Sequence, residues 1–360
     1  MSTVHAYKTT PRQATEFIID CFESPKRNVA FLQGPPGIGK SAIVHAIAEN
    51  ANLELIDHRV STSTPEDFSG LPDMHGPKAV FKPYDVFPVE GDPLPKGKNG
   101  WILFLDEFNA GKKEVQAAAY KTILDRFVGQ KKLHKDVYVV AAGNRAIDRA
   151  IVNSLSTAMQ SRLIHLDVEL KFNDFMEDVA IKYDWDSRII GYLSYKEDKL
   201  MDFRPDHQDK TFCCPRTWDF MNGFLKGKTF EYKKLPDGTW YYGMEQKAPL
   251  YAGTITSGVA VDFIQFTKVG QNMPTIKQII NDPKGTPVPQ EPEIQWCTIT
   301  HCMENTKNDD TFEKITDYIN RYDANFRTLY FRSLFVRQPA LRHHPVVAKA
   351  ALELQKYLNG

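Results

Sequence analysis

The sequence predicts an α/β fold in its first half, a parallel sheet with flanking helices, followed by a helical lid with a β-hairpin insertion and C-terminal helices. Continuous apolar runs at residues 29–32, 101–105 and 137–142 are typical of parallel strands that are buried on both faces. The first of these runs leads through a glycine-rich segment into a helical pattern. Beyond residue 168 helical patterns dominate, except where Pro236-Asp237-Gly238 separates two aromatic runs and predicts a hairpin.

The chain has 360 residues, which is enough for two domains, and we place them at 1–168 and 169–360 with the hairpin insertion near 229–243. Lys plus Arg and Asp plus Glu each number 45, so attraction of nucleic acid over the whole surface is not expected. No apolar run reaches the roughly 18 residues of a membrane span, and residues 1–11 lack the apolar core of a secretory signal. We therefore expect a cytoplasmic protein without membrane contact.

A phosphate-binding loop is predicted directly after the first strand, because residues 34–41 fit the pattern G-x-x-x-x-G-K-[ST] at every fixed position. Its glycines let backbone amides approach a phosphate closely, and the helix that follows offers its positive end to the anion. Lys40 is expected to contact the β- and γ-phosphates, and Ser41 to bind Mg²⁺. The expected nucleotide-binding residues are Gly34, Pro35, Pro36, Gly37, Ile38, Gly39, Lys40, Ser41 and Ala42.

Two acids end the buried run at residues 101–105 and are expected to face the ligand crevice of the sheet. Asp106 is the expected partner of Mg²⁺, directly or through water, and Glu107 the base that orients the attacking water. Asn144 follows the run at 137–142 and could hydrogen-bond the γ-phosphate or that water, or it could simply form a turn. Arg162 lies at the turn before a last strand at 163–168.

Several local structures are predicted around these residues. A helix is expected at 14–22, a strand at 53–56, a short capped helix from Thr64 and Pro65, and a helix at 113–127 followed by a hairpin within 127–133. Residues 72–100 are predicted to form a functional surface loop. Within it, residues 79–81 are expected to pair with residues 86–87 as a small hairpin.

Two further groups of residues admit a functional interpretation. Cys297, His301 and Cys302 lack a second pair of metal ligands nearby, so we expect buried, inert thiols rather than a zinc site. Aromatic residues of the predicted hairpin accompany Lys226, Lys228, Lys233 and Lys234 and could stack on single-stranded nucleic acid. A hairpin that packs against its own domain or the next subunit is the favoured interpretation.

The order of these motifs resembles the AAA+ ATPases, and more closely their MoxR-like branch, from about residue 29 to 226. The resemblance is weaker over 252–339. It depends on the phosphate loop and on three further motifs, which are Thr64-Pro65-Glu66-Asp67 with Gly70, Asp106-Glu107-Phe108-Asn109-Ala110, and Pro215-Arg216-Thr217-Trp218. By this resemblance Lys40 and Ser41 are Walker A, Asp106 and Glu107 are Walker B, Asn144 is sensor 1 and Arg216 is sensor 2.

The resemblance also implies that Arg162 is an arginine finger that acts on the nucleotide of the neighbouring subunit, in a ring most often of six. Arg162 is flanked by Ser161 and Leu163, where relatives often have an acid and Phe, so Arg145 and Arg126 stay open as alternatives. The 72–100 loop occupies the place of the helix 2 insert of this branch.

The function expected from the resemblance is Mg²⁺-dependent ATP hydrolysis by a homo-oligomeric ring that remodels or matures a protein client. A protein with a von Willebrand A domain is the expected partner. Two alternatives remain, a nucleic-acid-dependent motor or loader and a scaffold whose assembly is gated by nucleotide binding. The intact acids at 106 and 107 favour turnover over the scaffold.

Overall fold

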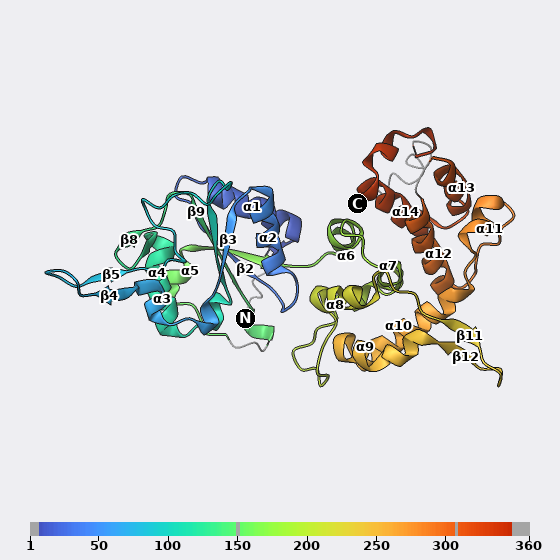
Figure 1. Ribbon diagram of the computed structural model, residues 1–360, viewed down its shortest axis with the longest axis horizontal. Helices are drawn as coiled ribbons and strands as arrows, with labels where there is room; N and C mark the ends of the chain where they lie inside the picture. Colours follow the sequence, from blue (N-terminus) through green and yellow to red (C-terminus); the bar gives the residue numbers. More distant parts are fainter. Residues whose placement is uncertain (1–6, 149–151, 307–308, 348–360) are drawn as a thin grey trace. The chain divides into compact units, whose positions relative to one another are not determined.

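The computed structural model describes residues 7–148, 152–306 and 309–347 and divides the chain into two compact units, Met1–Leu170 and Lys171–Gly360 (Figure 1). Within the described residues no helix is both long and apolar enough to cross a membrane.

The first unit is built on a six-stranded sheet in the order β1-β10-β2-β9-β6-β3, in which every pair of neighbours is parallel. The sheet places β2 between β10 and β9, so that Leu32 has Leu166 on one side and Ala142 on the other. The predicted fold class is confirmed. The strands are β1 Lys8–Thr9, β2 Val29–Gln33, β3 Glu54–Arg59, β6 Trp101–Asp106, β9 Val137–Gly143 and β10 Leu163–Val168.

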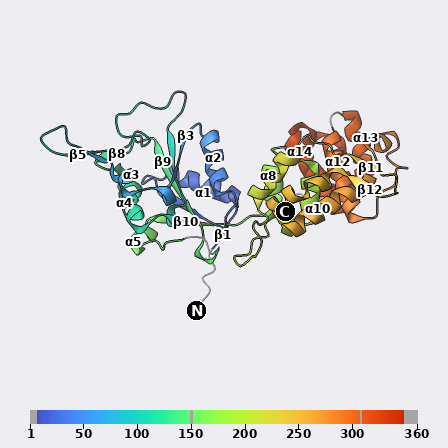
Figure 2. The ribbon, with the colours of Figure 1, turned by 60° about the horizontal axis from the view of Figure 1, so that its bottom comes forward.

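Helices cover both faces of this sheet, because successive side chains of the buried strands point to opposite sides. Ala30 and Leu32 belong to one hydrophobic core with α1 and α2, whereas Val29 and Phe31 belong to another with α4. Figures 1 and 2 show α1 and α2 on one face and α3, α4 and α5 on the other. These helices are α1 Pro11–Glu23, α2 Lys40–Asn50, α3 Pro65–Ser69, α4 Lys113–Leu124 and α5 Thr157–Gln160.

The predicted pairing of residues 79–81 with 86–87 is wrong. β5 (Val80–Lys82) pairs instead with β4 (Leu71–Asp73), and the hairpin projects from the first unit in both views (Figures 1 and 2). Phe87 is buried and packs against Phe68, with 5.8 Å between the ring centroids. Burial of this large ring stabilises more than a second exposed ladder would, which removes residues 86–87 from pairing.

The helix predicted at 113–127 ends earlier, because α4 stops at Leu124. Arg126 adopts a positive φ of 59°, which a helix cannot continue through. The chain then forms the predicted hairpin of β7 (Phe127–Val128) and β8 (Lys131–Lys132).

The second unit is helical around an aromatic core in which Tyr192 and Trp218 both contact Phe263. Helices dominate this unit, as predicted, and the predicted hairpin is present, whereas α9 is an element that the sequence did not predict. Its segment begins with Ala248-Pro249 and ends with β-branched residues, which give a weak helical signal. The elements are α6 Phe172–Phe175, a π-helical turn Met176–Ile181, α7 Ser187–Tyr195, α8 Pro215–Leu225, β11 Tyr232–Lys234, β12 Trp240–Tyr242, α9 Ala248–Ile255, α10 Ser257–Val269, α11 Ile276–Asn281, α12 Pro292–Asn305, α13 Asp309–Ile319 and α14 Ala324–Arg337.

The hairpin of β11 and β12 has an aromatic inner face. Tyr232 stacks on Trp240 with ring centroids 4.7 Å apart, and Tyr242 is buried at the base. Trp240 nevertheless keeps 49% of its surface exposed. The hairpin therefore has an anchored base and an exposed aromatic residue near its tip.

Candidate nucleotide-binding site

The predicted phosphate loop connects β2 to α2 at the carboxyl end of the sheet. Gly37 and Gly39 adopt φ values of 76° and 101°, conformations that other residues rarely take. A Cβ at Gly34 would lie 3.1 Å from the carbonyl oxygen of Val168, so the neighbouring strand also favours glycine there. The loop therefore has the backbone that a phosphate cradle requires.

Lys40, the first residue of α2, is only 8% exposed. Its ammonium donates to the carbonyl oxygens of Gly34 at 2.9 Å and Pro35 at 3.1 Å, and to Oδ1 of Asn144 at 3.1 Å. Lys40 thus connects the loop to the end of β9, and its charge lies where a phosphate oxygen could replace a carbonyl as acceptor.

Ser41 and Asp106 meet across the sheet, where the serine hydroxyl donates to Oδ2 of Asp106 at 3.1 Å. The other oxygen, Oδ1, accepts the backbone N–H of Glu107 at 2.8 Å. A hydroxyl and a carboxylate are oxygen ligands of the kind that Mg²⁺ prefers, and both side chains are half-buried. This pair fits a magnesium ion that keeps most of its water ligands.

Glu107 has a strained backbone, with φ 51° and ψ 34° in the left-handed region. For a residue other than glycine this conformation costs on the order of 1–3 kcal/mol, and such strain concentrates at functional sites. Its carboxylate accepts a hydrogen bond from the hydroxyl of Ser61. Both residues, together with Ala110 and Asn144, line a cavity of about 350 Å³.

Asn144 is held by a second asparagine that the sequence analysis did not assign a role. The amide of Asn109 donates to the backbone oxygen of Asn144 at 2.7 Å, and its oxygen accepts the backbone N–H of Asn144 at 3.1 Å. Asn109 is only 3% exposed. A Cβ at Gly143 would lie 2.2 Å from the oxygen of Asn109, which explains why glycine precedes Asn144.

Ser61 and Asn109 are therefore residues of the candidate site that the sequence did not predict. Asn109 carried one signal, since a polar residue follows two acids at the end of a buried strand. Ser61 carried none, because it lies within the polar run Ser61-Thr62-Ser63-Thr64, in which nothing distinguishes one hydroxyl from another.

The three candidate arginines differ in how their guanidinium groups are bound. Arg145 forms a bidentate pair with Asp148 at 2.8 and 3.0 Å, and these hydrogen bonds raise its pKa. Arg126 donates to the backbone oxygens of His134 at 3.2 Å and Val137 at 2.6 Å, and burial lowers its pKa. Both side chains bind within their own unit.

Arg162 is exposed, in contrast to Arg145 and Arg126. Its guanidinium donates to the carbonyl oxygen of Ala158 at 2.8 Å and lies 5.4 Å from the centre of the Tyr120 ring. Neither contact buries it, so the group is accessible to another chain.

Arg216 belongs to the second unit, where it is exposed in the first turn of α8. Cys214 caps this helix, with its backbone N–H donating to the Thr217 hydroxyl at 2.9 Å.

The zinc interpretation has no support in the described part of the chain, where no group of three or more His, Cys, Asp or Glu residues is placed to hold a metal ion. Burial raises the pKa of Cys297 to about 12 and also raises the pKa of Cys302. Burial lowers the pKa of His301. These are the shifts of inert, packed side chains.

Two of the four lysines near the hairpin are paired with carboxylates. Lys226 binds Asp184 at 2.6 Å, and Lys233 binds Glu231 at 2.7 Å. This pairing reduces the positive charge that a nucleic acid strand would meet.

Comparison with known proteins adds a family match for part of the chain. Residues 30–167 match the family described as "ATPase family associated with various cellular activities (AAA)". This stretch includes Lys40, Asp106, Glu107, Asn144 and Arg162. No curated protein matches the chain.

Solved structures show distant similarity. An ATPase candidate from Cytophaga hutchinsonii is 18% identical over 47% of this chain and 49% of its own, about half its length, with a TM-score of 0.34. A variant of RuvB from Thermotoga maritima is 14% identical over 77% of this chain and 78% of its own, with a TM-score of 0.35.

Proposed function

With an AAA ATPase domain at residues 30–167, we propose that the chain hydrolyses ATP with Mg²⁺ and does so as a ring of identical subunits. One observation carries the proposal. Two hydrogen bonds, from Lys40 to Asn144 and from Ser41 to Asp106, join the phosphate loop to the ends of two other strands. They gather a cation, a hydroxyl and a carboxylate around one loop, the set that phosphoryl transfer needs.

Each residue has a role that follows from its chemistry. Lys40 and the loop amides would bind the phosphates, and Ser41 and Asp106 would hold the metal. When bound, Mg²⁺ offsets negative charge on the phosphate oxygens. Glu107 lines the cavity, where it accepts a proton from the attacking water, while Asn144 orients that water or the γ-phosphate.

Ser61 holds Glu107 before reaction. Its hydroxyl donates to the carboxylate that would otherwise accept a proton from water. The hydrogen bond therefore fixes the direction of the carboxylate and competes with the water for it, so it must weaken or be exchanged during turnover.

We assign the trans-acting role to Arg162. Of the three candidates it alone is exposed, whereas Arg145 and Arg126 are half-buried and bind groups of their own unit. A guanidinium supplied by a neighbouring subunit stabilises charge on the transferring phosphoryl group. Arg216 is the proposed sensor 2.

The proposed biological role is that of a MoxR-like, chaperone-like ATPase, a hexameric ring in the cytoplasm that remodels or matures a protein client together with a von Willebrand A domain protein. This role depends on the resemblance described above. Stimulation of the ATPase by a candidate client, and not by single-stranded DNA, would support it.

The test of the enzymatic proposal is a comparison of Glu107→Gln with the wild-type protein. We expect the variant to bind a fluorescent ATP analogue with unchanged affinity and to release phosphate at least about 100-fold more slowly. EDTA should abolish wild-type turnover. Unchanged turnover in Glu107→Gln would remove Glu107 from its role, and a wild-type protein that binds ATP without hydrolysing it would favour the nucleotide-gated scaffold.

A further inference from the structure

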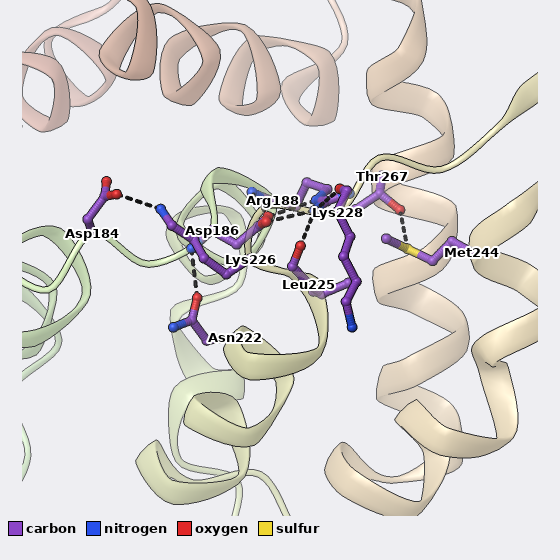
Figure 3. Close-up of polar contacts among 9 residues, drawn as sticks. All are labelled: Asp184, Asp186, Arg188, Asn222, Leu225, Lys226, Lys228, Met244 and Thr267. Carbon is purple, nitrogen blue, oxygen red and sulfur yellow. Dashed lines mark hydrogen bonds and ion pairs between the residues drawn. The ribbon is translucent and has the colours of Figure 1, made fainter.

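The turn at residues 184–188 includes the first two residues of α7 and lies against the C-terminal end of α8 (Figure 3). This end of α8 is opposite the first turn, which carries Arg216. The turn is the sequence Asp184-Trp185-Asp186-Ser187-Arg188, in which three of the five residues are charged.

Arg188 is the centre of the contacts in this turn. Its Nε and Nη2 atoms each donate to one carboxylate oxygen of Asp186 at 2.7 Å. Nη2 also donates to the carbonyl oxygens of Leu225 and Lys228, both at 2.9 Å. Leu225 is the last residue of α8, so the guanidinium caps the negative end of that helix.

The neighbouring residues hold the same end of α8. The backbone N–H of Asp186 donates to Oδ1 of Asn222 at 2.8 Å. Lys226 binds Asp184 at 2.6 Å. The last turn of α8 is therefore fixed by a side-chain amide, a backbone carbonyl and a lysine, all contacted from one five-residue turn (Figure 3).

The ion pair of Asp186 and Arg188 is largely shielded from solvent. Asp186 is buried, and the side chain of Arg188 is 22% exposed. Burial acts to lower the pKa of Arg188, but the hydrogen bonds and charge of Asp186 outweigh it, so that the pKa is raised. The guanidinium is therefore charged at neutral pH.

The Arg188 guanidinium also contacts the residue that leads into the first strand of the hairpin. It lies 5.2 Å from the centre of the Phe230 ring, just before β11. The segment that follows the second strand of the hairpin is held separately, because the buried hydroxyl of Thr267 in α10 donates to the sulfur of Met244 at 3.3 Å (Figure 3). α8 and the hairpin thus share Arg188 as a common support.

From this arrangement we propose that Arg188 is a positioning residue for Arg216. α8 has 11 residues and is about 16 Å long, at 1.5 Å per residue. The first turn of α8 is anchored by the buried Trp218, whose indole N–H donates to the carbonyl oxygen of Lys199 at 2.7 Å. A tilt of about 10° about this anchor would move the tip of the Arg216 side chain, roughly 6 Å from the helix axis, by about 1 Å, more than the roughly 0.5 Å tolerance of a productive contact. The inference rests on the proposed role of Arg216 in hydrolysis.

The experiment compares Arg188→Lys with wild type in the full-length protein. Lysine keeps the charge but cannot bind both oxygens of Asp186 and two carbonyls at once. We expect kcat to fall about 10-fold while KM for ATP changes less than about twofold, because a misplaced group costs turnover rather than affinity. Asn222→Ala is a milder second variant, in which we expect a fall of about threefold.

The matched control is Arg321→Lys. Arg321 also donates to two backbone carbonyls of the second unit, Pro283 at 2.8 Å and Thr286 at 2.7 Å, without contacting α8. We expect it to change thermal stability as much as Arg188→Lys does and to leave kcat unchanged.

A double-mutant cycle separates positioning from general destabilisation. If Arg188 acts through Arg216, Arg188→Lys lowers kcat in the wild-type background and has no further effect in Arg216→Ala. An unchanged kcat in both Arg188→Lys and Asn222→Ala, or effects that multiply in the double variant, would overturn the inference alone. If Arg216→Ala itself leaves kcat unchanged, the proposed role of Arg216 fails and the inference fails with it.

Discussion

The nucleotide site of the first unit and the 184–188 turn of the second unit both hold charged side chains against backbone carbonyls, yet they differ in what those contacts do. Lys40 donates to two carbonyls of a loop whose glycines leave space for an anion. Arg188 donates to carbonyls that end a helix and begin a hairpin root, with Asp186 already bound to it.

These contacts distinguish a ligand-binding site from a structural cluster. In the first unit a ligand can replace the present partners. A phosphate oxygen can accept from Lys40 in place of a carbonyl oxygen, and a metal ion can bind the carboxylate of Asp106 in place of the Ser41 hydroxyl. In the second unit no ligand can replace the partners of Arg188. They are backbone carbonyls at the end of α8 and before the hairpin, and a carboxylate that is already bound to it. Substitutions in the first region should therefore change activity with little loss of stability. Substitutions of fold-bound arginines should lower stability, and only for Arg188 do we expect kcat to fall as well, because its loss also shifts α8.

The largest expected effect is that of Arg162→Ala. We expect hydrolysis to fall on the order of 10³-fold, because a trans-acting guanidinium contributes that much to phosphoryl transfer. Stability should change by less than about 0.5 kcal/mol, since the side chain is exposed. Steady-state phosphate release and a thermal melt measure the two quantities, and retained activity would transfer the role to another residue.

Arg126→Ala should give the opposite result. The variant leaves the carbonyl oxygens of His134 and Val137 without their donor, so we expect a loss of about 2–3 kcal/mol in the free energy of unfolding. Urea denaturation measures it. Activity per folded molecule should be unchanged, and a variant that melts normally but does not hydrolyse ATP would identify Arg126 as a functional residue.

Lys40→Ala sharpens the comparison from within the nucleotide site. Loss of one charge-assisted contact to phosphate should weaken ATP binding by about 2 kcal/mol, or roughly 30-fold. Fluorescence titration with an ATP analogue measures this, and thermal stability without nucleotide is the internal control. A large fall in melting temperature without a change in affinity would show that the bonds of Lys40 belong to the fold.

Ser61→Ala has the smallest expected effect. Removing the hydroxyl frees the carboxylate of Glu107 from the hydrogen bond that fixes its direction, so we expect kcat to fall about fivefold, the size of a hydrogen bond that contributes about 1 kcal/mol. Ser63→Ala is the matched control, since its hydroxyl contacts His58 instead. Equal effects in the two variants would mean that the segment, and not the bond to Glu107, matters.

The sequence was sufficient for the fold class and for the main strands because buried parallel strands read as continuous apolar runs, as in Trp101 to Leu105. Prediction from the sequence failed where tertiary packing or backbone conformation overrides the local pattern of apolar residues. Phe87 had the apolar pattern of a strand but is buried against Phe68 instead. Arg126 stops α4 through its own backbone conformation, which no periodicity records.

The residues of the candidate site likewise include some that the sequence predicts and some that it does not. Lys40, Ser41, Asp106 and Glu107 were predictable because fixed spacing along the chain reflects fixed chemistry. Ser61 and Asn109 were not, because each acts through a partner 46 or 35 positions away along the chain. Contacts of that kind depend on which strands are neighbours in the sheet.

The most direct test of the central claim, a site completed by a neighbouring subunit, is phosphate release by an equimolar mixture of Glu107→Gln and Arg162→Ala. Each variant alone should be inactive. In mixed rings a subunit with intact Glu107 can receive Arg162 from its neighbour, so we predict recovery of about a quarter of wild-type activity by random pairing. A mixture that stays inactive, although affinity tags show that the rings contain both variants, would contradict the account.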